Sequence, residues 1–92
     1  MIRTFRHKGL ERLFTASIAR GIPAAYRARI ERMLDRLDAS IRPGDMNVPG
    51  WQLHPLHGDR KGRWAVSVSG SLRLTFGFDG EDAVDIDLED YH

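Results

Sequence analysis

The amino-acid sequence predicts an α+β fold, in which an N-terminal strand and a helical hairpin precede an antiparallel sheet. Two observations support this prediction. Residues 10–37 carry apolar side chains at the three- and four-residue spacings typical of helices. Residues 64–88 instead alternate apolar and polar side chains, and short turns separate the alternating runs. A sequence of helices followed by strands places both helices on one face of the sheet.

The length of 92 residues suits one domain with a single modest core, so we expect one domain over residues 1–92. No apolar run approaches the roughly 20 residues of a membrane span. The sequence contains no cysteine, which excludes disulfides and thiolate sites. A cytoplasmic location without membrane contact is the simplest interpretation.

The first half of the chain contains the expected first strand and both helices. Residues 2–6 are rich in strand formers. The first helix should end near Gly21, which favours a left-handed C-cap. The second helix should begin two residues later at Pro23, because proline is tolerated at the first position of a helix. The apolar face of the first helix consists of Leu10, Leu13, Phe14 and Ile18. That of the second consists of Tyr26, Ile30, Met33, Leu34 and Leu37.

The second half of the chain contains the expected sheet. Turn-forming residues mark 39–50 as a loop, after which residues 51–53 form a short strand candidate. Residues 64–68, 72–78 and 83–88 alternate as strands. The expected inward side chains of the last two strands are Leu72, Leu74, Phe76, Phe78, Val84, Ile86 and Leu88. The expected outward ones are Arg73, Thr75, Gly77, Asp85 and Asp87.

Charge is strongly segregated along the chain. Residues 1–73 contain all 14 lysines and arginines and six acids, a net charge of +8, whereas residues 74–92 contain seven acids and no basic residue. Such asymmetry favours a cationic surface for a polyanion beside an acidic edge. Mutual neutralisation of the two parts within the fold is the alternative interpretation.

The loop of residues 53–63 carries two histidines and three cations. Pro55 restricts His54 to extended geometry, and His57 follows three residues after His54. Imidazole exchanges protons near neutral pH, which suits acid–base chemistry. The His-x-x-His pair also resembles part of a metal site, but such a site would need more ligands, one of them from His92. We therefore expect no metal and no other cofactor.

Three further residues outside this loop are candidates. Arg73 lies mid-strand on the polar face, where its guanidinium could clamp a phosphate or, alternatively, form an ordinary surface ion pair. Tyr91 and His92 directly follow the last predicted strand, so they could be held beside the sheet or could fray. The combination of His54, His57, Arg73, Tyr91 and His92 supplies the base, cation and acid that metal-free RNA cleavage needs.

Four segments, at residues 5–10, 53–60, 72–76 and 90–92, resemble the HigB family of host-inhibition-of-growth toxins, within the RelE/ParE superfamily. The resemblance implies a toxin with the RelE-like microbial ribonuclease fold that enters the ribosomal A site, cleaves mRNA and arrests growth. It also implies a helix-turn-helix antitoxin, HigA, which binds the toxin and represses the shared operon, so that operator DNA is reached only through the antitoxin.

Carried over residue by residue, the active positions of the family fall on His54, Arg73, Tyr91 and His92. His57 replaces a lysine common in the family, and Leu72 replaces an aromatic residue that often precedes the strand arginine. Phosphates of rRNA and mRNA would be held by cations, among them Lys8, Arg60, Lys61 and Arg63. Three other functions stay open: a gyrase inhibitor of ParE type, a non-catalytic regulator and a nuclease of free RNA.

Overall fold

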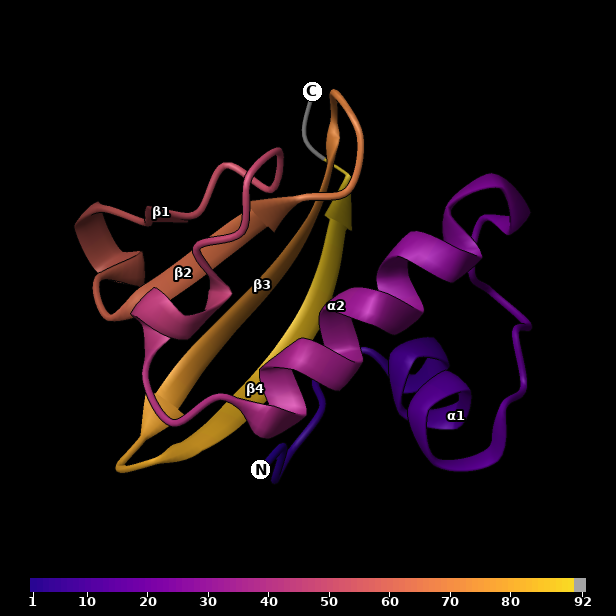
Figure 1. The fold of residues 1–92 in the computed structure, drawn as a ribbon, viewed down its shortest axis with the longest axis horizontal. Coiled ribbons are helices and arrows are strands. Elements are labelled where there is room, and N and C mark those ends of the chain that lie inside the picture. Colours follow the sequence, from indigo (N-terminus) through magenta and orange to yellow (C-terminus); the bar gives the residue numbers. More distant parts are fainter. Residues whose placement is uncertain (91–92) are drawn as a thin grey trace.

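The computed structural model describes residues 1–90 and contains two α-helices and a four-stranded antiparallel sheet (Figure 1). The helices are α1 (Lys8–Ala16) and α2 (Arg27–Ala39). The strands are β1 (His54–Pro55), β2 (Arg63–Ser67), β3 (Leu72–Asp79) and β4 (Asp82–Asp90), and each pairs with the next in chain order. The predicted α+β class is confirmed. Neither of the described helices is long and apolar enough to cross a membrane.

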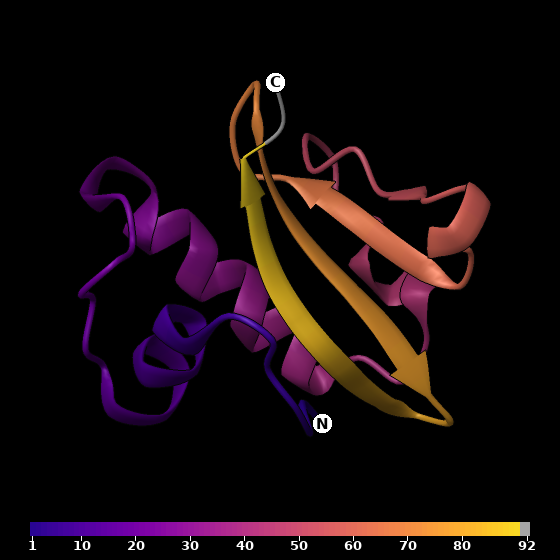
Figure 2. The ribbon, with the colours of Figure 1, turned by 180° about the vertical axis from the view of Figure 1, so that it is seen from behind.

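The core lies between α2 and the sheet, with α1 beside both α2 and β4 (Figures 1 and 2). Four of the apolar residues predicted for the second helix are buried: Ile30, Met33, Leu34 and Leu37. They face apolar side chains of the strands, among which Phe76 is the largest fully buried residue. Burying each such side chain contributes about 1.5–3 kcal/mol to stability.

The first helix is shorter than the sequence predicts, and the connection to α2 is longer. Ser17 adopts a left-handed conformation with φ of 57°, and its amide donates to the carbonyl of Leu13. This cap ends α1 before Ile18, which is 46% exposed instead of lying on the buried face. The prediction that only two residues separate the helices is therefore wrong, because residues 17–26 lie between them. Tyr26 precedes α2 and is likewise exposed.

The strand predicted over residues 2–6 is replaced by two isolated parallel bridges to β4, one from Ile2 to Ala83 and one from Phe5 to Ile86. The N-terminal segment still runs along β4 (Figure 2). A regular ladder cannot form between the two bridges because Asp85 has a positive φ of 54°. The amide of Asp85 donates to Thr4 Oγ1 at 2.8 Å, so the irregularity is held by the N-terminal segment itself.

The irregularity at Asp85 also changes which β4 side chains face the core. The register shifts between Thr75 and Gly77 of β3, and Val84 pairs with Gly77 on the polar face. Ala83 occupies the buried position instead and is fully buried. The prediction of an inward Val84 is therefore wrong, whereas Ile86 is buried as predicted.

The short strand predicted at residues 51–53 lies three residues later, as β1 (His54–Pro55). Gln52 has a positive φ of 54°, which interrupts the extended run between Trp51 and His54. Trp51 instead turns into the core and is 9% exposed. The predicted loop of residues 39–50 contains a 3₁₀ helix, Pro43–Met46, whose last residue is fully buried.

Candidate active site

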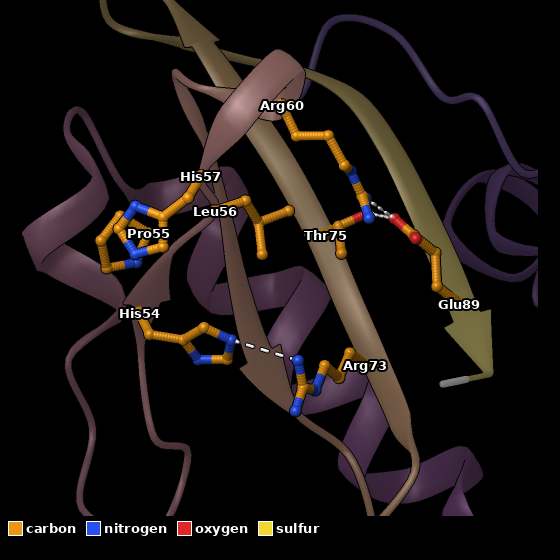
Figure 3. A pocket seen from close by; sticks show the side chains of 8 residues that line it. All are labelled: His54, Pro55, Leu56, His57, Arg60, Arg73, Thr75 and Glu89. Atoms are coloured by element: carbon orange, nitrogen blue, oxygen red, sulfur yellow. Dashed lines mark hydrogen bonds and ion pairs between the residues drawn. The ribbon is translucent and has the colours of Figure 1, made fainter. Parts of the chain in front are cut away.

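A pocket of about 330 Å³ lies on the polar face of the sheet, between the β1 loop on one side and β3 and β4 on the other (Figure 3). It is lined by His54, Pro55, Leu56, His57, Arg60, Arg73, Thr75 and Glu89. Five of these eight residues can carry charge, and five come from the loop that the sequence marks as chemically distinctive.

Strand register explains why the pocket forms here. His54 of β1 pairs with Ala65 of β2, and Ala65 pairs with Thr75 of β3, so the three residues form one row across the sheet. Ala65 in the middle of this row has only a methyl group. This small side chain leaves space between the larger side chains of His54 on β1 and Thr75 on β3. Arg73 lies two residues from Thr75 on the same face, as the alternation of β3 predicts.

The imidazole of His54 makes two polar contacts that together define its tautomer. Nδ1 lies 2.8 Å from the backbone carbonyl oxygen of Gln52, and Nε2 lies 3.4 Å from Nη1 of Arg73. A carbonyl oxygen only accepts hydrogen bonds and a guanidinium only donates them. Neutral His54 therefore satisfies both contacts with its proton on Nδ1 and a lone pair on Nε2. That lone pair faces Arg73 across the pocket (Figure 3).

A second polar cluster forms the opposite wall. Glu89 pairs with Arg60 and accepts a 2.6 Å hydrogen bond from Thr75 Oγ1. Burial opposes ionisation of Glu89, but the hydrogen bonds from Thr75 and Arg60 and the nearby guanidinium charges outweigh burial, so the pKa of Glu89 is lowered from 4.5. Glu89 therefore stays a carboxylate at neutral pH.

The cations predicted to bind RNA differ in their surroundings. Arg60 lines the pocket, and Lys61 is exposed beside it. Arg63 is half-buried and donates to Thr75 Oγ1 and to the carbonyl of Asp85, and burial lowers its pKa. Its guanidinium thus braces the β4 irregularity. Lys8 begins α1 and is exposed, and it does not line this pocket.

The structure brings together three of the five predicted catalytic residues. His54 and Arg73 are in contact, and His57 is an exposed residue of the pocket lining. Tyr91 and His92 lie outside the described residues, so their roles stay predictions. Among residues 1–90, no three histidine, aspartate or glutamate side chains lie close enough together to hold a metal ion.

Sequence reasoning missed the contributions of Gln52, Thr75 and Glu89 to this site. Thr75 could have been found, because it shares the polar face of β3 with Arg73. Glu89 pairs with Arg73 across β3 and β4, but that register depends on the irregularity at Asp85. The role of the Gln52 carbonyl follows from a backbone conformation that glutamine rarely adopts.

Known proteins resemble this chain in fold and in sequence. The crystal structure of a copper-bound point mutant of a toxin from Helicobacter pylori superposes with a TM-score of 0.54, covering 98% of this chain and 94% of that one. Its sequence is 14% identical, so this likeness concerns the fold alone. Endoribonuclease HigB of Proteus vulgaris is 41% identical over 92 residues, the full length of both proteins.

Residues 3–92 also match the family described as the RelE-like toxin of the type II toxin-antitoxin system HigB. The match includes the β1 loop and β3, which build the pocket. The family match and the similarity to the full-length relative both agree with the resemblance seen in the sequence. The chain therefore belongs to the family of HigB-like toxins.

Proposed function

We propose that the chain is an endoribonuclease, the toxin of a type II toxin–antitoxin system, and that it cleaves mRNA in the ribosomal A site. The observation that carries the proposal is the contact between His54 and Arg73, which sets Nε2 of the imidazole 3.4 Å from a guanidinium nitrogen. The name of the Proteus vulgaris relative, Endoribonuclease HigB, supports the same reaction.

In the proposed mechanism, His54 Nε2 removes the proton of a ribose 2′-hydroxyl. The 2′-oxygen attacks the adjacent phosphorus and forms a 2′,3′-cyclic phosphate, while the bond from phosphorus to the 5′-oxygen breaks. Arg73 stabilises the charge that develops on the phosphoryl oxygens, an electrostatic effect that requires no metal. We assign proton donation to the 5′-oxygen to His92 and orientation of the RNA to Tyr91. Each proton transfer of this kind contributes about 10²–10⁴-fold to the rate.

The second polar cluster gives Arg60 a place in substrate binding. Glu89 forms an ion pair with Arg60 in the free protein, so an incoming phosphate would compete with this carboxylate for the guanidinium. His57 and Lys61 lie on the same loop and would add contacts at the pocket entrance. Arg60 and Lys61 would hold the RNA backbone without reading base sequence.

Dependence on the ribosome follows from size and positioning. One side of the pocket consists of a two-residue strand and a short loop, which offer little surface for orienting a free RNA strand. Holding reacting groups in line is a large part of the catalytic effect, so a ribosome that presents the A-site codon would supply it. Inhibition of translation and growth would follow from cleavage of translated messages. The partner that restrains the toxin would be a HigA-like helix-turn-helix antitoxin.

Primer extension on a translated mRNA, with and without ribosomes, tests the proposal. Wild type should produce cuts at A-site codons only when ribosomes are present, and Arg73→Ala and deletion of His92 should abolish them. Cuts on naked RNA would overturn ribosome dependence. If Arg73→Ala cuts as fast as wild type, the assigned site is wrong. If no protein cuts, a supercoiling assay with gyrase tests the ParE-like alternative.

A further inference from the structure

Gln52 forms a strained turn two residues before the candidate base. Its φ of 54° lies in the left-handed region, which side chains other than glycine rarely adopt. Backbone strain of this kind persists only where surrounding contacts hold it, and it gathers near functional sites. The contacts around Gln52 therefore indicate what the strained conformation serves.

Two hydrogen bonds from one residue of β2 hold this turn. Ser67 Oγ lies 3.0 Å from Oε1 of Gln52 and donates to it. The backbone amide of Ser67 donates to the carbonyl of Trp51 at 2.7 Å. Ser67 thus anchors both the side chain of Gln52 and the peptide before it.

Arg29 of α2 makes two further hydrogen bonds to the same region. The guanidinium of Arg29 donates to the carbonyl of Gly50 at 3.0 Å and to the carbonyl of Ser67 at 2.9 Å. The turn and its anchor are thereby tied to the longest helix of the described chain. With these contacts in place, the carbonyl of Gln52 has a defined direction, and it lies 2.8 Å from Nδ1 of His54.

We infer that Gln52 is a positioning residue that, anchored by Ser67, holds neutral His54 in the Nδ1–H tautomer. Unconstrained imidazole side chains favour the Nε2–H tautomer, in which the proton would occupy the atom that must act as the base. The inference rests on the proposed function, because it matters for catalysis only if His54 Nε2 removes the 2′-hydroxyl proton. Gln52 acts through His54 and does not itself contact the reacting atoms.

Nitrogen-15 NMR of histidine-labelled protein tests the inference without RNA. At a pH of about 8.5, above the titration range of ordinary imidazoles, two-bond correlations distinguish Nδ1–H from Nε2–H. The signal of His54 is assigned by its loss in His54→Gln. We expect His54 as Nδ1–H in wild type and a shift toward Nε2–H in Ser67→Ala and in Gln52→Leu, neither of which can complete the anchoring hydrogen bond. Ser67→Thr retains the hydroxyl and should retain the wild-type tautomer.

Thr15→Ala provides a matched control, because it removes a hydroxyl that bonds within α1, far from this turn in the sequence. In cleavage assays, kcat should fall about fivefold in Ser67→Ala if the competent tautomer drops to about one fifth, with KM little changed. Wild-type His54 in the Nε2–H form would overturn the inference even if the protein cleaves RNA. So would an unchanged tautomer in both anchor variants. The expected tautomer shift in a protein that cleaves no RNA would support the positioning contact and overturn the proposed function instead.

Discussion

Thr75 Oγ1 donates a 2.6 Å hydrogen bond to Glu89 across the β3–β4 pair, so a carboxylate is fixed in the wall of a pocket that should bind an anion. Arg60 binds the same carboxylate. The contact gives Glu89 two roles that can be measured separately, one in stability and one in pairing with Arg60 of the pocket.

The first prediction concerns acid stability. The pKa of Glu89 is lowered on folding, so below its ordinary value of 4.5 the unfolded chain binds more protons than the folded chain. Stability from this group is present above pH 4.5 and is lost as the pH falls through the lowered pKa of the folded state. In urea unfolding at pH 3–6, Glu89→Gln should show a flatter dependence on pH than wild type.

Asp45 provides a control for that measurement, because a hydrogen bond from the amide of Ile41 lowers its pKa although it lies in the loop after α2, outside the pocket. Asp45→Asn should flatten the same acid range without changing RNA binding. Glu89→Gln should flatten the acid range and also change RNA binding, since it releases Arg60 from its ion pair. Parallel stability curves for Glu89→Gln and wild type would contradict the prediction.

The second prediction concerns the base. His54→Gln should lower the cleavage rate by about 10²–10⁴-fold, because glutamine can occupy the site but cannot remove a proton. Circular dichroism checks that the variant is folded. A folded variant that cleaves as fast as wild type would mean that another group is the base.

The third prediction concerns His57, the exposed loop residue at the position where the resemblance to the family implies a lysine. His57→Lys should strengthen RNA binding at neutral pH, because it adds a full positive charge at the pocket entrance. The slope of log affinity against log salt concentration should steepen by about 0.7, the value for one additional phosphate contact on a single strand. His57→Gln serves as the uncharged control and should leave the slope at its wild-type value or below it.

The fourth prediction concerns the positive φ of Asp85. Asp85→Val should destabilise the protein by about 1–3 kcal/mol, because a β-branched side chain strongly disfavours the left-handed region. Asp85→Gly loses the same exposed ion pair with Arg6 but accepts this backbone angle. Urea midpoints should therefore rank Asp85→Gly above Asp85→Val. The reverse order would contradict the assignment of the stability difference to the backbone angle at Asp85.

Local patterns predicted the parts of the fold in which neighbours along the chain settle the conformation. The alternation of β3 places Leu74 and Phe76 in the core and Arg73 on the opposite face, as the sequence predicts. The apolar spacing of α2 likewise predicts its buried face. Both follow from a period that each element imposes on its own side chains.

The features that the sequence did not predict depend on distant partners or on strained backbone. The irregularity at Asp85 is held by Thr4, at a sequence separation of 81 residues, and it turns Val84 away from the core. For the site, the loop histidines and Arg73 were recognised by residue type and by family resemblance. The contacts of Gln52 and Glu89 were not, because they arise from a left-handed turn and from a shifted register.

The pairing of the N-terminal segment with β4 has a consequence for biosynthesis. The N-terminal residues, which are synthesised first, form hydrogen bonds with a strand that is synthesised about 80 residues later, as between Thr4 and Asp85. At synthesis rates of about 5–20 residues per second, these early residues wait roughly 4–16 s for their partners. Glu89, which completes the pocket wall, belongs to the same late strand. A nascent chain therefore lacks an assembled pocket until β4 has been made, so any activity of this pocket begins only after nearly all of the described residues have been synthesised.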